Sequence, residues 1–223
     1  MNVSCAKSMR FLTSIFVYLS FQCGVIAQFD TSKLMLEFFL DKSYLQRFQV
    51  NQCRFYISQI NVWKNGQIIH KDDRPGVLVD LNSNNRYSQL IFLENIEADS
   101  ISVLYGLDSL QQISGAFEGD LDPIHGMYWT WNTGYIHYKL ECTERDSARL
   151  YPQIKLHLGG FAYPYNTSFQ KTYPINMNRI RLCVDPSPML SKVSQWNKER
   201  VMSPGKQAGV LSWLFVHHIK SIP

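Results

Sequence analysis

A cluster of aromatic and sulfur-containing side chains lies between residues 120 and 142, in a stretch that reads DLDPIHGMYWTWNTGYIHYKLEC. If residues 127–131 are extended, the odd positions project from one face, because side chains alternate along a strand. That face carries His125, Met127, Trp129 and Trp131. Imidazole and thioether are donors that copper favours, and the thioether selects Cu(I). The spacing therefore predicts a copper site at which His125, Met127 and Trp129 meet.

The same stretch also fits a tryptophan-rich core strand in which Met127 only fills space, since methionine and aromatic side chains usually pack. A second histidine, His157, lies in the alternating run IKLHL and faces away from Leu156. Two glycines follow it, so the backbone can turn directly after this side chain. A structural and a metal-binding role remain open for His157.

Two stretches together indicate a family. The run GMYWTWNTGYIHYKLE over residues 126–141, preceded by LDP over 121–123 and followed by LHLGG over 156–160, resembles the MbnP-like family of periplasmic copper-binding proteins. The resemblance extends more loosely over nearly all of the chain after its first 27 residues. It departs at Cys142, where the family usually has glycine.

The resemblance implies an exported β-sandwich that binds copper in acquisition, storage or delivery. It also implies that one tryptophan of the motif, Trp129 or Trp131, is converted to kynurenine at the metal site by a dihaem partner similar to the cytochrome c peroxidases. His157 matches the family's histidine. Opening the indole ring exposes an aniline nitrogen, a donor that tryptophan lacks.

Other chemistry finds less support in the sequence. Glu118, Asp120 and Asp122 are spaced for a calcium turn or a carboxylate pair, but the rest of an EF-hand loop is missing and a solvated turn fits as well. No nucleophile elbow, phosphate loop, dinucleotide fingerprint or zinc-protease motif appears. We expect a binding protein rather than an enzyme. The alternative is a secreted recognition module whose aromatic face binds carbohydrate or peptide without metal.

The first 27 residues predict an export signal. Lys7 and Arg10 precede an apolar run from Phe11 to Phe21, and Val25-Ile26-Ala27 suits cleavage after Ala27. Removal of this segment takes away two basic and no acidic residues, so the formal net charge falls from +4 to +2, which argues against nucleic acid as a partner. No later segment is apolar enough for a membrane span. We therefore expect a periplasmic or secreted protein with one domain over residues 28–223.

Three cysteines remain after that cleavage: Cys53, Cys142 and Cys183. An odd number allows at most one disulfide, in any of three pairings, and leaves one thiol over. Export makes an unpaired thiol unusual, so the third is expected to be buried or a soft metal ligand. The sequence does not distinguish these arrangements.

The pattern of hydrophobic residues predicts an all-β fold, an antiparallel β-sandwich or barrel-like sheet with one or two short C-terminal helices. Period-2 alternation occurs over residues 34–40, 55–57 and 101–105, and Asn65-Gly66 suits a tight hairpin. Near the end, Ser203 can cap a helix that begins at Pro204, and a second helix is expected over about residues 189–200. His137 is expected to face solvent, and the His217-His218 pair to end the last helix.

Overall fold

The computed structural model describes residues 33–41, 48–94, 97–131, 134–145, 153–176 and 179–222. The chain divides into two compact units, Met1–Asp30 and Thr31–Pro223, and all described residues belong to the second. The predicted export signal over residues 1–27 lies outside the described residues.

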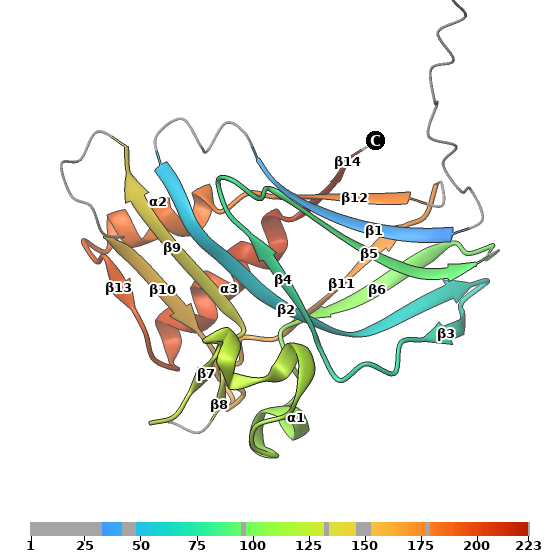
Figure 1. Cartoon of the computed structure of the whole chain (residues 1–223), viewed down its shortest axis with the longest axis horizontal. Helices are drawn as coiled ribbons and strands as arrows, with labels where there is room; N and C mark the ends of the chain where they lie inside the picture. Colours follow the sequence, from blue (N-terminus) through green and yellow to red (C-terminus); the bar gives the residue numbers. More distant parts are fainter. Residues whose placement is uncertain are drawn as a thin grey trace, which may run out of the picture. The chain divides into compact units, whose positions relative to one another are not determined.

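Two curved β-sheets make up most of the second unit (Figure 1). The larger sheet has the order β11 (Phe169–Pro174), β6 (Ser100–Tyr105), β2 (Phe48–Lys64), β9 (Tyr138–Glu144), β10 (Ile154–Leu158) and β13 (Arg200–Val201), with β3 (Gln67–Lys71) and β4 (Val77–Leu81) also paired to β2. The smaller sheet has the order β14 (Lys220–Ile222), β12 (Arg179–Val184), β1 (Lys33–Leu40) and β5 (Tyr87–Glu94). Most pairs are antiparallel, and β1 with β12 and β10 with β13 are parallel. The predicted all-β sandwich is confirmed.

The main core lies between the two sheets. On β1 the alternate residues Leu34, Leu36, Phe38 and Leu40 are buried in it, as the period-2 pattern predicts. The ring of Phe38 meets that of Phe55 on β2 edge to face, with centroids 5.3 Å apart. Each fully buried side chain of this size contributes about 1.5–3 kcal/mol, so burial between the sheets dominates the stability of the fold.

The hairpin between β2 and β3 forms at the predicted position. Asn65 and Gly66 have φ values of 51° and 76°, the left-handed conformation that a type I′ turn needs at both central residues. Asparagine and glycine tolerate this conformation best, which is why the dipeptide marks the turn in the sequence.

Two C-terminal helices cover one end of the larger sheet. Helix α2 spans Ser187–Gln195 and α3 spans Lys206–His218. Gly205, rather than Ser203, is the N-cap residue of α3, so the predicted start was two residues early. Phe215 of α3 packs on Phe55 and Tyr138, with ring centroids 5.2 and 5.1 Å apart. Within the described residues, no helix has both the length and the apolar character needed to span a bilayer.

The neighbour along one edge of β2 changes at Tyr56. Its N–H donates to the carbonyl of His137 just before β9, and its carbonyl accepts from Gly106 just after β6. The N–H and C=O of one strand residue point to the same edge, so β6 and β9 lie end to end along β2. The chain between them, residues 106–137, leaves the sheet at this fork, and we refer to it as the lobe.

The lobe contains α1 (Ser109–Ile113), the 3-10 turns η2 (Gly119–Leu121) and η3 (Pro123–His125), and the short pair β7 (Tyr128–Trp129) and β8 (Gly134–Tyr135). Its own small core, distinct from the main core, gathers the buried residues Tyr56, Leu107, Leu121, Met127, Trp129, Tyr135 and Ile136. Figure 1 shows the lobe beyond the ends of β9 and β10. The aromatic motif therefore folds as a separate layer against the larger sheet.

Candidate metal centre

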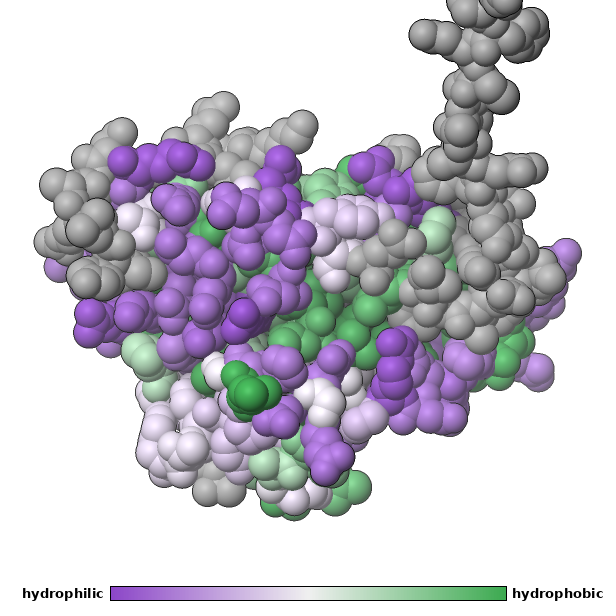
Figure 2. All heavy atoms as spheres, in the orientation of Figure 1, coloured by the Kyte–Doolittle hydropathy of each residue, from purple (hydrophilic) through white to green (hydrophobic). Residues whose placement is uncertain are grey.

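His157 lies on the outer face of the larger sheet, because its neighbours Leu156 and Leu158 point into the main core. A row of polar side chains crosses four neighbouring strands on this face. Each member is paired in register with the next, in the order Asp80, Arg54, Lys139 and His157. Figure 2 shows mostly hydrophilic residues over β9 and the part of β2 beside it. His157 itself is only 8% exposed, so it is the buried end of a polar row.

Glu141, one position diagonal to His157 on β9, lies against the imidazole. The Nε2 atom of His157 is 2.8 Å from Oε1 of Glu141. Burial lowers the pKa of His157, the hydrogen bond to Glu141 acts in the opposite direction, and the nearby charge of Lys139 lowers it further. The ring is therefore neutral at pH 7, and Nε2–H donates to the carboxylate.

This tautomer leaves Nδ1 of His157 with its lone pair. Within the described part of the chain, Nδ1 has no hydrogen-bond partner. Histidines that bind metals through one ring nitrogen commonly donate the other N–H to a carboxylate, which orients the ring and makes it a better donor. His157 and Glu141 have this arrangement.

Trp129 lies at the same end of the sheet. A β-carbon built on Gly159 would be 2.9 Å from Cζ3 of Trp129, so the indole touches the backbone two residues beyond His157. Gly159 directly follows β10, the strand that carries His157. The structure thus places the indole of Trp129 at the end of this strand, two residues from His157 along the chain.

Met127 is buried in the core of the lobe together with Trp129. Its carbonyl accepts a hydrogen bond from Ile136 N–H at 2.8 Å, which pairs the two halves of the motif. The thioether is completely buried among apolar side chains. Met127 therefore belongs to the same buried cluster as Trp129 and acts as a core residue there.

His125 does not share a face with Met127. Pro123 begins the 3-10 turn η3, and Gly126 ends it in the left-handed conformation with φ of 66°, so the predicted extended strand contains only Tyr128 and Trp129. His125 is half-buried, and its Nε2 lies 3.1 Å from the carbonyl oxygen of Gly119. The expectation of one continuous donor face from residue 125 to 131 was wrong.

Trp131 follows β7 in the turn and is 64% exposed, whereas Trp129 is 5% exposed. The two indoles are in tilted contact, with centroids 5.6 Å apart. The two tryptophans of the motif therefore have different surroundings, one between lobe and sheet and the other at the surface.

Two cations hold the lobe on the sheet, and neither stands out in the sequence. Arg54 donates from one guanidinium nitrogen to the carbonyl oxygen of His125 at 2.9 Å, and Lys139 donates to that of Gly126 at 3.2 Å. Arg54 is also paired with Asp80 at 2.8 Å. Glu141 was likewise missed, because strand register decides which carboxylate reaches His157.

His137 is completely buried, so the expectation that it faces solvent was wrong. Its Nε2 lies 3.2 Å from Oε1 of Gln112 on α1, and its Nδ1 lies 2.9 Å from Oγ1 of Thr167. Burial lowers the pKa of His137 to about 3, so this ring is neutral as well. Only the fork between β6 and β9, invisible in the local pattern, explains its burial.

The acidic turn has a structural role. Asp120 accepts the N–H of Leu78 at 3.0 Å, and Asp122 accepts that of Ile124 at 2.8 Å as the N-cap of η3. Across the described residues, no three His, Cys, Asp or Glu side chains are grouped as metal ligands. These carboxylates act within the turn itself, and the calcium alternative weighed for them has no support in this geometry.

The three cysteines, all within the described residues, are present as thiols. Cys53 and Cys142 lie in the main core, and burial raises the pKa of Cys53 far above its usual value. Cys183 on β12 is half-buried, and burial raises its pKa to about 11. Protonated thiols in these places lie away from the outer face that carries His157.

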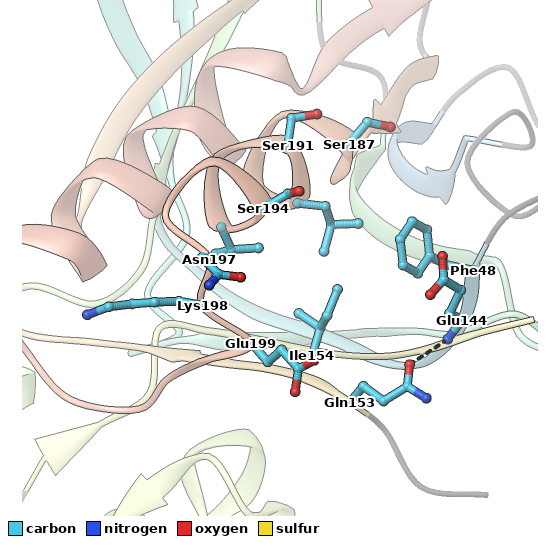
Figure 3. A pocket seen from close by; sticks show the side chains of 12 residues that line it. Phe48, Glu144, Gln153, Ile154, Ser187, Ser191, Ser194, Asn197, Lys198 and Glu199 are labelled. Atoms are coloured by element: carbon cyan, nitrogen blue, oxygen red, sulfur yellow. Dashed lines mark hydrogen bonds between the residues drawn. The ribbon is translucent and has the colours of Figure 1, made fainter. Parts of the chain in front are cut away.

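A cleft of about 630 Å³ lies between α2 and the far ends of β9 and β10 (Figure 3). Ser187, Ser191 and Ser194 of α2 line one side, and Ile154 and Glu144 the other. His157 is at the opposite end of β10, so the cleft and the candidate metal centre are separate.

The comparison with protein families decides the kinship of the chain. The family model described as MbnP matches residues 17–203 of the 223. The chain belongs to the MbnP family. Its fold is similar to that of MbnP from Methylosinus trichosporium, with a TM-score of 0.51 over 71% of this chain and 77% of that chain, at 10% sequence identity. No curated protein sequence matches. The prediction of an MbnP-like protein from residues 126–141 and 156–160 is confirmed.

The two tryptophans of this MbnP-family motif make different contributions to stability. We expect Trp129→Ala to lower the free energy of unfolding by about 3–5 kcal/mol, because it empties the contact between lobe and sheet. Trp131→Ala should cost no more than about 1 kcal/mol, since most of the ring is already in water. Urea unfolding followed by circular dichroism measures both. Equal losses would contradict the placement of the two rings.

Gly159 has no room for a side chain. A β-carbon there would lie 2.4 Å from the carbonyl oxygen of Tyr135, so we expect Gly159→Ala to destabilise the fold by about 1–3 kcal/mol. Gly209→Ala on α3 is the matched control, because its β-carbon would meet no atom closer than 3.5 Å and alanine favours a helix by up to about 1 kcal/mol. Thermal unfolding of both variants should show opposite signs.

Acid should act through His137. Its pKa of about 3 in the folded chain is below its ordinary value of 6.5, so the unfolded state binds the additional proton between these values. The stability that the neutral ring contributes is complete above about pH 6.5 and falls with pH by up to about 1.4 kcal/mol per unit. We expect a flatter pH profile of unfolding for His137→Gln. Parallel profiles for the two proteins would show that His137 does not titrate in this way.

Proposed function

We propose that this MbnP-family chain is an exported copper-binding protein for acquisition, storage or delivery of the metal, with His157 as its principal protein ligand. The observation that supports this proposal is the His157–Glu141 pair, whose histidine lies on the strand whose end meets the indole of Trp129. A neutral imidazole is oriented by a carboxylate and keeps one ring nitrogen available at the boundary between lobe and sheet. Copper is bound well by such a nitrogen.

The unmodified residues at this place fit copper only in part. His157 Nδ1 is the available nitrogen, and Glu141 orients it or adds an oxygen. The thioether of Met127 is enclosed in the core of the lobe, and His125 turns to the carbonyl of Gly119. The chain therefore supplies a strong donor and an auxiliary one, which leaves room for a further donor.

Conversion of Trp129 to kynurenine would supply that further donor, as the family resemblance implies. The product carries an aniline nitrogen and a ketone in place of the indole ring. We favour Trp129 over Trp131, because the indole of Trp129 lies at the turn after His157 while Trp131 is at the surface. A dihaem protein similar to the cytochrome c peroxidases would perform the oxidation, and the chain itself would not be an enzyme.

A second candidate function is recognition without metal. Trp213, Tyr165 and Phe169 line a groove of about 410 Å³ between α3 and the chain around residue 165. Trp213 and Tyr165 are about half exposed, and exposed aromatic rings favour stacking on sugars or peptides. Copper retention by the purified protein distinguishes the two functions.

Copper binding tests the proposal directly. We expect the wild type to hold one Cu(I) against a chromogenic copper chelator and His157→Ala to bind at least about tenfold more weakly. Glu141→Leu should weaken binding by about 10–100-fold, because the imidazole loses the group that orients it. His125→Ala is the matched control, since the hydrogen bond of that half-buried ring goes to the backbone carbonyl of Gly119 and not to His157 or Glu141.

Equal affinity of the wild type and His157→Ala would contradict the assignment of the site. Intact mass of protein from its native host tests the modification separately. Kynurenine in place of tryptophan changes the side chain by the loss of one carbon and the gain of one oxygen, and peptide mapping assigns the change to residue 129 or 131.

A further inference from the structure

His137 is the one completely buried imidazole among the described residues, and the copper site as proposed does not use it. It lies where three segments meet. Its N–H donates to the carbonyl of Leu158 at 2.7 Å, its carbonyl accepts from Tyr56 at 3.0 Å, and its ring lies against Gly106. The side chain therefore occupies the fork from which the lobe leaves the sheet.

The two ring nitrogens contact two different segments, Gln112 on α1 and Thr167 on the loop after β10. A neutral ring has one N–H, so one contact must be donated to it. The hydroxyl of Thr167 lies 2.9 Å from Nδ1 and 2.8 Å from the carbonyl oxygen of Gly160, so its single proton is shared between these two acceptors. Nε2–H then donates to Oε1 of Gln112 at 3.2 Å, so both ring nitrogens have a polar partner.

Each partner makes a further hydrogen bond, Gln112 to β8 and Thr167 to the turn after β10. Gln112 donates from its amide nitrogen to the carbonyl oxygen of Tyr135 at 3.0 Å. Thr167 lies within hydrogen-bond distance of the carbonyl oxygen of Gly160, 2.8 Å from the hydroxyl. Gly160 follows Gly159 in the chain, and a β-carbon on Gly159 would lie 2.4 Å from the carbonyl oxygen of Tyr135 and 2.9 Å from the indole of Trp129.

We propose that His137 is a positioning residue for the candidate metal centre. Its neutral ring bridges Gln112 and Thr167 and so fixes the turn at Gly159 and Gly160 against Trp129. The same turn ends the strand that carries His157. His137 does not touch the metal. The effect of His137 on copper affinity rests on the proposed function. Its effect on the position of Trp129 rests on the contacts alone.

The experiment compares His137→Leu, Thr167→Val and His137→Gln in the full-length mature protein. Thr143→Val is the matched control, because it removes a similar hydroxyl hydrogen bond, to Asn51 at 2.9 Å, elsewhere on β9. Two readouts are taken for each: Cu(I) affinity by chelator competition, and the chemical shift of the Trp129 indole N–H by NMR in metal-free protein, assigned with Trp129→Phe.

We expect His137→Leu and Thr167→Val to shift the Trp129 resonance and to weaken Cu(I) binding by about tenfold, the range found when groups that orient a metal ligand are removed. His137→Gln, whose amide also offers a donor and an acceptor, should restore most of the affinity. Thr143→Val should leave both readouts unchanged. Thr167→Val keeps the test decisive if His137→Leu does not fold.

An unchanged Trp129 resonance in folded Thr167→Val would overturn the proposal. So would equal losses in Thr167→Val and Thr143→Val, because they would show a general effect of stability. If the wild type binds no Cu(I), the copper function fails, while the indole resonance still decides whether His137 positions Trp129.

Discussion

The geometry at Tyr56 determines how this chain is organised. The carbonyl of Tyr56 bonds to the chain at the end of β6, and its N–H bonds to the chain at the start of β9. Two strands therefore pair with successive parts of the same edge of β2. A gap between two strand ends exposes backbone polar groups, which must find partners. His137 and Gly106 supply these partners, and the residues between them form the lobe. The position of the candidate metal centre is a result of this fork, because the lobe covers the sheet only near the gap.

The lobe depends on a few polar contacts as much as on its small core. Arg54 and Lys139 reach up from the sheet to consecutive carbonyl groups, those of His125 and Gly126. Carbonyl groups near the end of a short 3-10 turn lack partners within the turn, so cations satisfy them well. Burial lowers the pKa of Lys139, while the charge of Glu141 acts in the opposite direction. The carboxylate that orients His157 thus also lies near the cation that holds the lobe.

Local patterns were sufficient to predict much of the fold. Alternation over residues 34–40 identified a core strand, and Asn65-Gly66 identified a hairpin, because each depends on residues close in sequence. The family motif predicted that the stretches carrying His157 and Trp129 would meet. The roles of Glu141 and His137 were not predicted, because they depend on strand register and on the fork at Tyr56, and both are long-range features. Residues 125–131 also resisted prediction, since Pro123 and Gly126 make a turn where the hydrophobic pattern suggested a strand.

The separation of the two cores affects how a solute reaches the indole of Trp129. Leu107, Met127 and Tyr135 form a cluster that is distinct from the one between the sheets. Proteins open in cooperative units whose free energies follow their own buried contacts, and a small cluster opens more readily than a large one. Separation of the lobe from β9 and β10 would uncover Trp129 while the sandwich stays closed. Amide hydrogens of β7 and β8 would then exchange with solvent faster than those of β2, and entry to the indole would not require unfolding.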